Sequence, residues 1–82
     1  MITAKEIIER IQKALPGAQV QVVDTGGGDH WSAVVVASQF EGKSRVEQHK
    51  MVQAPLKDKI ADNSIHALQL KTQTPAEAAK TR

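Results

Sequence analysis

The N-terminal segment carries apolar side chains three, four and seven positions apart, which is the spacing of one helix face. Thr3 and Glu6 form the pattern of a capping box, in which each side chain binds a backbone N–H that the helix leaves free. Ile2 stands at a hydrophobic staple position, and Pro16 follows as a stop signal. The sequence therefore predicts a first helix whose apolar stripe consists of Ile7, Ile8, Ile11, Ala14 and Leu15.

The next two apolar segments have the pattern of strands. Residues 19–23 alternate weakly and are rich in valine, and residues 31–38 form a short β-branched run bounded by turn residues. Residues 24–29 contain three consecutive glycines, which predict a mobile or sharply bent loop. Because so few residues separate the two strands, we expect them to pair as an antiparallel hairpin.

A second helix is predicted to begin at Ser44, which forms a capping box with Glu47. Pro55 breaks this helix or begins a short second one over residues 56–61, since proline is tolerated in a first turn. The side of the helix that we expect to face the core carries Val46, His49, Val52 and Leu56.

The C-terminal segment predicts one more strand and one more helix. Residues 65–72 alternate with period two, which places His66, Leu68 and Leu70 on one face. Thr74 and Glu77 form a third capping box around Pro75 and start a short final helix. About 25 residues separate the second strand from the third, a crossover that suits a right-handed parallel pair. The whole chain, residues 1–82, is thus expected to be one α/β (α+β) domain, a three-stranded mixed sheet with helices on one face.

Composition narrows the classes of function. The 82 residues include no cysteine, so the chain offers neither a disulfide nor a thiolate, and any iron–sulfur role must borrow sulfur from a partner. No apolar run is long enough to span a bilayer, and the N-terminus does not resemble a signal peptide. We therefore expect a soluble protein without a membrane role, of bacterial cytoplasmic type; a processed organellar protein would look similar. No arrangement of nucleophile, base and acid is visible, so an enzyme is not expected.

Several blocks of the sequence resemble the BolA family when they are taken together and in order. The resemblance covers nearly the whole chain. These blocks are Gly28–Val36, Phe40–Ser44, Gln48–Lys50, Ile65–Leu68 and Lys71–Glu77.

The resemblance implies a class II KH-like fold with the order α-β-β-α-α-β-α. It also implies a monothiol glutaredoxin as partner, with which BolA-like proteins share a 2Fe–2S cluster in iron–sulfur trafficking and in iron or redox regulation. The cluster is held by a glutaredoxin cysteine, by glutathione and by ligands of the BolA-like chain. The implied ligands here are His66, at the start of the last strand, and His30, in the loop between the first two strands.

The chemistry of imidazole agrees with this role, although each histidine also has a simpler interpretation. Imidazole replaces thiolate on one iron of Rieske clusters, and it must be neutral to bind a metal, which ties binding to pH. On its pattern alone, His66 would be a half-buried strand residue and His30 an exposed loop residue. His49 is interpreted as structural, fixing the junction of helix and sheet through a hydrogen bond.

The helical middle of the chain is basic. Its cations are a candidate contact for an acidic partner or, as the alternative function, for DNA bound by a transcriptional regulator. The junction of residues 53–56 lacks the Gly-x-x-Gly loop with which KH domains bind RNA, and the family's more usual Arg-His-Arg segment is here Gln-His-Lys, which weakens a phosphate-contacting role. DNA binding through the basic helix stays open. A weak homodimer of the free chain is also allowed. The candidate contact residues are Lys43, Arg45, His49, Lys50 and Lys57.

Overall fold

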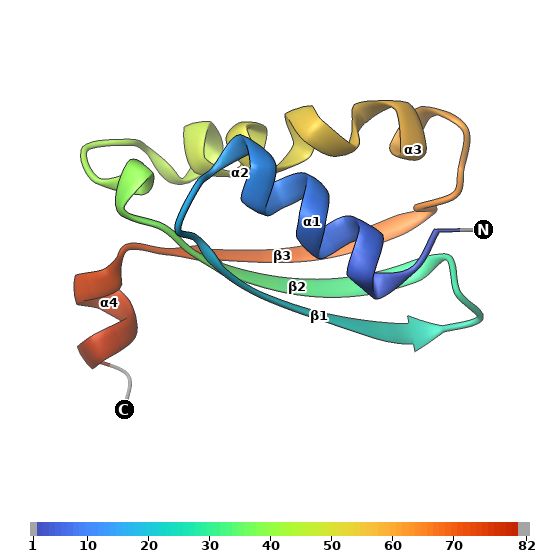
Figure 1. The fold of residues 1–82 in the computed structure, drawn as a ribbon, viewed down its shortest axis with the longest axis horizontal. Coiled ribbons are helices and arrows are strands. Elements are labelled where there is room, and N and C mark those ends of the chain that lie inside the picture. Colours follow the sequence, from blue (N-terminus) through green and yellow to red (C-terminus); the bar gives the residue numbers. More distant parts are fainter. Residues whose placement is uncertain (1, 81–82) are drawn as a thin grey trace.

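The computed structural model describes residues 2–80. Figure 1 shows a curved sheet with a helical layer across one face and the last helix beyond one end of the sheet. The single turns η1 and η2 are 3-10 helices. In chain order the elements are α1 (Ala4–Ala14), β1 (Gln19–Gly26), β2 (His30–Val36), η1 (Ser38–Phe40), α2 (Arg45–Gln53), η2 (Ala54–Leu56), α3 (Lys57–Ala61), β3 (Ala67–Gln73) and α4 (Pro75–Lys80).

The strand order is β1-β2-β3, with β2 at the centre. β1 and β2 are antiparallel, and β2 and β3 are parallel, so the predicted hairpin and the predicted parallel crossover are both confirmed. The element order and the mixed sheet also agree with the prediction. Within the described residues no helix is long and apolar enough to cross a bilayer.

One face of the sheet is buried under the helices and the other is left open. On the central strand Trp31, Ala33 and Val35 are buried, and the residues between them are only half-buried. Leu68 and Leu70 of β3 pair with Trp31 and Ala33 and pack against the same core. The buried apolar cluster contains Ile2, Ile7, Ile11, Leu15, Ala18, Trp31, Val35, Ala37, Phe40, Val52, Leu56 and Ile65.

Helix α1 begins as predicted but uses only part of its capping box. The Thr3 hydroxyl accepts the Glu6 N–H at 3.2 Å, while the Glu6 carboxylate pairs with Arg10 one turn later. The buried stripe of α1 is also narrower than the predicted one, since Ala14 is exposed. Three residues spaced four apart, Ile7, Ile11 and Leu15, are buried.

The predicted core side of the second helix was wrong in one respect. Val46 is 64% exposed, whereas Gln48 and Val52 are the buried residues of α2. A helix turns 100° per residue, so Gln48 and Val52, four apart, share a line from which Val46 points away. The predicted break at Pro55 is confirmed, because η2 begins at Ala54 and turns Leu56 into the core.

The strand ends differ from the predicted ones. β1 extends through Gly26, with an irregular register between Asp24 and Gly26 that absorbs part of the glycine loop. β2 ends at Val36, and the chain then makes a 3-10 turn that buries Phe40. β3 begins at Ala67, so the residues from 64 to 66 form a bend rather than the start of the strand.

Candidate functional site

His30 and His66 lie side by side at one end of the sheet. Their ring centroids are 5.4 Å apart and the ring planes differ by 23°, which is a stacked pair. His30 is the first residue of β2, and His66 immediately precedes β3. Because these strands are parallel, with His30 paired to Ala67, the two histidines come to the same end. The resemblance named both residues, and the fold places them in contact.

The backbone beside the pair is held by one carbonyl. The Asp29 oxygen accepts the N–H groups of His66 and Ala67, at 2.8 and 3.2 Å. Ile65, next to His66, is only 1% exposed, and its own N–H donates to the Lys59 carbonyl. The predicted alternation of His66 with the leucines of β3 was therefore wrong: His66 lies on the bend before the strand and is exposed.

The imidazoles of His30 and His66 are accessible. The His30 side chain is 49% exposed, and the nearest Asp29 carboxylate oxygen lies 3.7 Å from its Nε2, too far for a hydrogen bond. Among residues 2–80, no hydrogen bond engages a ring nitrogen of either histidine. Both rings can thus accept a metal.

The donor set of the described residues is incomplete for a metal site. No group of three histidine or carboxylate side chains in residues 2–80 could hold a metal ion, and the sequence has no cysteine. Two accessible imidazoles without further ligands fit a cluster whose remaining ligands come from another molecule. Imidazole is an accepted ligand of iron in such clusters.

The glycine loop is sharply bent and internally bonded. Gly27 and Gly28 have φ angles of +70° and +84°, in the left-handed region that favours glycine. A carboxylate oxygen of Asp24 accepts the N–H groups of Gly26 and Gly28, at 2.9 and 3.2 Å. Of the two predicted descriptions of this loop, sharply bent and mobile, the structure supports the first.

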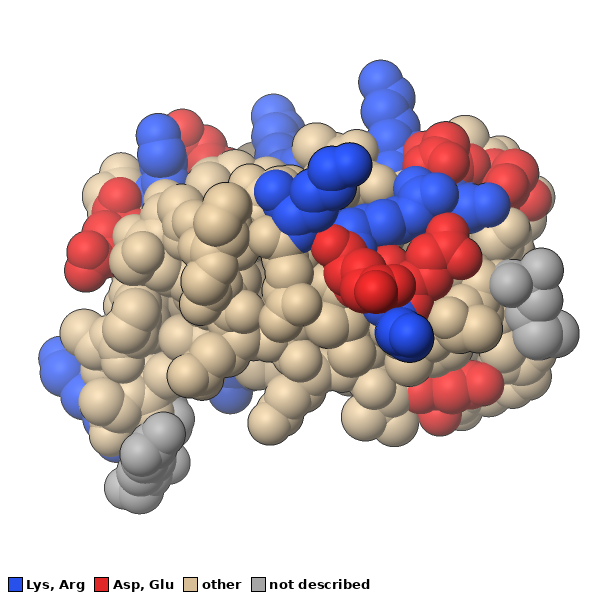
Figure 2. All heavy atoms as spheres, viewed as in Figure 1, with Lys and Arg blue, Asp and Glu red and all other residues tan. Residues whose placement is uncertain are grey.

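The basic residues of the helical middle divide into two groups. Lys43, Lys50 and Lys57 stand seven residues apart in the sequence and are exposed, and we call these three residues the lysine row. Figure 2 shows Lys and Arg side chains projecting from the helical layer, with acidic side chains among them. Arg45 and His49 do not belong to this row, because both line a hollow beside the edge of β3.

A shallow apolar hollow lies beside two residues of the lysine row, Lys50 and Lys57. Its volume is about 380 Å³, and it lies where α2, η2 and α3 meet. Lys50 and Lys57 are both part of its lining, and Ile60 is 37% exposed there. The remaining lining residues are Gln53, Ala54 and Ala61.

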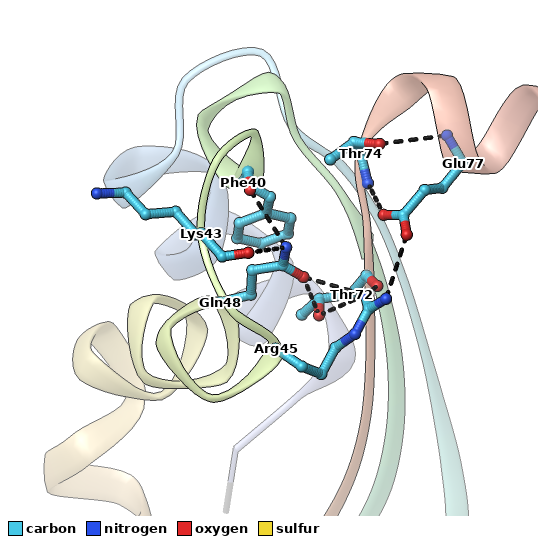
Figure 3. Close-up of polar contacts among 7 residues, drawn as sticks. All are labelled: Phe40, Lys43, Arg45, Gln48, Thr72, Thr74 and Glu77. Atoms are coloured by element: carbon cyan, nitrogen blue, oxygen red, sulfur yellow. Dashed lines mark hydrogen bonds and ion pairs between the residues drawn. The ribbon is translucent and has the colours of Figure 1, made fainter.

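The polar network that fastens α2 to β3 was not predicted (Figure 3). Gln48 Oε1 accepts the Thr72 hydroxyl at 2.7 Å, and both side chains are buried. Arg45 donates to the Thr72 carbonyl and pairs with Glu77 on α4 at 3.2 Å. The hydrogen bond expected of His49 at this junction is therefore made by Gln48 and Arg45. The available signal was a polar residue four positions before Val52, on the buried line of the helix.

Two carboxyl groups near this network are held in their ionised form. The pKa of Glu77 is lowered, first by the backbone N–H of Thr74 and then by the Arg45 guanidinium. The pKa of Glu47 is lowered mainly by the backbone N–H of Ser44. Both glutamates belong to predicted capping boxes, and in each of the two boxes both expected hydrogen bonds are present.

Comparison with known proteins agrees with this geometry. The chain is 42% identical to the acid stress protein IbaG of Escherichia coli strain K12 over 77 residues, which cover 94% of this chain and 89% of that protein. It is 35% identical to the protein BOLA2 of Arabidopsis thaliana over 80 residues, covering 94% and 84% of the two chains.

The fold is also that of solved structures. A bol-like protein from Babesia bovis superimposes with a TM-score of 0.86 at 30% identity, covering 100% of this chain and 96% of the other. The model of the family described as BolA-like protein matches residues 6–77. The sequence blocks, the sheet order and these matches agree, and the chain belongs to the BolA-like protein family.

Proposed function

We propose that this chain is a non-catalytic adaptor that docks on a monothiol glutaredoxin and lends His66 and His30 to a shared 2Fe–2S cluster. The observation that carries the proposal is the stacked, accessible histidine pair. The partner would supply the thiolates, from its own cysteine and from bound glutathione, that this sequence lacks. The cluster would join the two proteins and serve iron–sulfur trafficking or iron and redox regulation.

The residues of this chain have separate tasks in such a complex. His66 is fixed by its neighbours, since Ile65 is buried before it and β3 begins directly after it. His30 is the first residue after the glycine loop, and its ring lies against that of His66. The pair offers two imidazole donors at one point on the surface, and the ring nitrogen that binds a metal must carry no proton.

The lysine row is suited to guide the docking. Its last residue, Lys57, begins α3, and α3 lies at the same end of the sheet as the starts of β2 and β3 (Figure 1). A partner that reaches the histidine pair could therefore also contact Lys57. Exposed lysines steer an acidic surface by long-range attraction and contribute more to the rate of association than to its final strength.

The test is a titration of this protein into a glutathione-ligated 2Fe–2S monothiol glutaredoxin, followed by visible absorption and circular dichroism. We expect the wild-type chain to reshape the cluster spectrum, His66→Ala to abolish the change and His30→Ala to weaken it. His49→Ala is the matched control, because His49 lies away from the pair beside β3. Far-ultraviolet dichroism of each variant verifies the fold.

An unchanged spectrum with the wild-type chain would overturn the proposal. The DNA-binding alternative would then be tested by a gel shift with duplex DNA at rising salt, since phosphate contacts weaken steeply with ionic strength. The structure gives that alternative little support. Arg45, one of the candidate contact residues, is already engaged by Thr72 and Glu77.

A further inference from the structure

Asp24 organises the loop that leads to His30. One carboxylate oxygen of Asp24 accepts two backbone N–H groups, from Gly26 at 2.9 Å and from Gly28 at 3.2 Å. Gly26 is in turn the residue that pairs with His30 across the hairpin. The carboxylate therefore bonds the loop at two points, one of which is the sheet partner of the histidine.

Apart from its last residue, Asp29, whose carbonyl accepts the N–H groups of His66 and Ala67, the loop has little else to define its shape. Gly26, Gly27 and Gly28 carry no side chains to pack, and a run of glycines has many alternative conformations. A Cβ placed on Gly27 would meet only an oxygen of Asp29, at 3.6 Å. In the folded chain the two hydrogen bonds to Asp24 select one turn among those that the glycines allow.

The two histidines differ in how they are held. His66 lies outside the strand pairing, and its backbone is fixed by the buried Ile65 before it and by its own N–H, which donates to the Asp29 carbonyl. His30 is the first residue of β2 and pairs with Ala67 of β3 on one side and with Gly26 of the glycine turn on the other, while its side chain is half-exposed. The pairing with β3 fixes one side of His30, and the glycine turn, through Gly26, sets the other.

We propose that Asp24 is a positioning residue for the histidine pair, which keeps His30 against His66 by bonding the glycine turn. This inference rests on the proposed function for its consequence, the joint ligation of a cluster. Its structural part, the stacking of two rings in the free protein, stands independently. Groups that orient metal ligands without touching the metal commonly change metal affinity by about tenfold or more when removed.

The experiment compares Asp24→Ala with Asp24→Asn. In the free protein, proton NMR measures the nuclear Overhauser effects between the His30 and His66 rings. With the cluster-loaded glutaredoxin, the dichroism titration measures the concentration of this chain that is needed to reshape the cluster spectrum. We expect Asp24→Ala to lose most of the ring–ring signal and to require about tenfold more protein. Asp24→Asn should retain both, because its amide oxygen can still accept the two N–H groups.

Asp62→Ala is the matched control. An Asp62 carboxylate oxygen accepts the Ser64 N–H at 2.9 Å in the bend before His66, so the same type of bond is removed at the other histidine. Because the buried Ile65 holds His66 in addition, we expect Asp62→Ala to leave the ring–ring signal nearly unchanged.

The outcomes separate the two proposals. If Asp24→Ala keeps the full ring–ring signal while its amide spectrum shows a folded chain, the positioning role of Asp24 is refuted. If Asp24→Asn loses the signal as completely as alanine, the role of the acceptor oxygen is refuted. If the ring–ring signal falls as expected but even the wild-type chain does not alter the cluster, the positioning role stands and the proposed function fails.

Discussion

The hydroxyl of Thr72 on β3 donates a 2.7 Å hydrogen bond to the side-chain oxygen of Gln48 on α2, and both side chains are buried (Figure 3). The amide nitrogen of Gln48 donates to the carbonyls of Phe40 and Lys43, at 3.2 and 3.1 Å. Gln48 thus joins the turn before α2 to the sheet. A buried polar group stabilises a fold only when its partners are in place, and here both ends of the amide are bonded.

Replacing Gln48 is expected to destabilise the protein strongly. Gln48→Leu keeps an apolar volume but leaves the carbonyls of Phe40 and Lys43 and the hydroxyl of Thr72 without this partner. A buried group that loses its partner costs about 1–3 kcal/mol, so we expect the free energy of unfolding to fall by about 2–4 kcal/mol. Urea unfolding followed by far-ultraviolet circular dichroism measures the loss.

Thr72→Val and Gln69→Leu provide the comparison for this variant. Thr72→Val removes one hydroxyl, while Arg45 still donates to the Gln48 oxygen at 3.1 Å, so the cost should be about 1 kcal/mol. Gln69 is exposed on β3, and Gln69→Leu should change the stability little. A Gln48→Leu protein as stable as Gln69→Leu would show that the network does not fasten α2.

The sequence pattern was sufficient for the element order but not for this network. Apolar spacing and capping residues identify each helix and strand because burial of one face repeats with the period of the element. Gln48 does not follow this rule, because the cost of burying its polar side chain is offset by hydrogen bonds to two backbone carbonyls. No local sequence pattern predicts these bonds. Val46 was therefore assigned to the core although it is 64% exposed.

In the candidate site, too, the residues could be predicted from the sequence but their contacts could not. Resemblance named His30 and His66, but their stacking depends on the parallel register of β2 and β3, which joins residues far apart in the chain. The proposed role of Asp24 depends on the hydrogen bonds that its carboxylate accepts from two backbone N–H groups, and the sequence pattern does not predict these either. Sequence spacing predicts faces of single elements, whereas such contacts depend on how the elements are placed in three dimensions.

Acid should weaken the fold through the two capping glutamates. The folded-state pKa values of Glu47 and Glu77 lie below the ordinary value of 4.5. Their ionised forms therefore contribute stability at neutral pH, and this contribution is lost as the pH falls below 4.5 and through the folded-state values. We expect Glu77→Gln to be less stable than the wild type at pH 7 and the difference to shrink below about pH 4.

Urea midpoints measured from pH 7 to pH 3 test this expectation. Glu41→Gln is the control, because Glu41 is exposed in the turn before α2 and takes no part in a capping box. The Glu77 assignment would be contradicted by a stability gap that stays constant over the whole range. Such a gap would mean that the glutamine loses packing rather than charge-dependent hydrogen bonds.

Trp31 is buried with its indole N–H unsatisfied, and it should tolerate loss of that group. Trp31 is 4% exposed, and its Nε1 has no hydrogen-bond partner among the described residues. Trp31→Phe removes some buried area, but it also removes an unsatisfied donor that costs about 1–3 kcal/mol. We expect its free energy of unfolding to lie within about 1 kcal/mol of the wild-type value, because the two changes oppose each other.

Trp31→Ala distinguishes this balance from a general tolerance at the site. Alanine leaves a cavity in the core and should cost about 3–5 kcal/mol in urea unfolding. If Trp31→Phe were as damaging as Trp31→Ala, the indole N–H would have a partner in solution, and a buried water would be the first candidate.

Under the proposed function, charge reversal in the lysine row should slow docking on a glutaredoxin without altering the histidine pair. Lys50→Glu combined with Lys57→Glu replaces two cations by two anions beside the apolar hollow. Because exposed charges act mainly on the encounter, we expect the association rate at low salt to fall by about tenfold and the difference to shrink at 0.5 M salt. Stopped-flow measurement of the cluster spectrum gives the rate.

Lys71→Glu with Lys13→Glu is the matched control for that variant, since it makes the same change in net charge away from the lysine row. Lys71 is exposed on β3, where the neighbouring Thr72 faces the helices, and Lys13 is exposed near the end of α1. Because both double variants change the net charge equally, a difference between their association rates would point to a local docking surface. Equal rates for both would assign the effect to net charge and remove the lysine row from the interface.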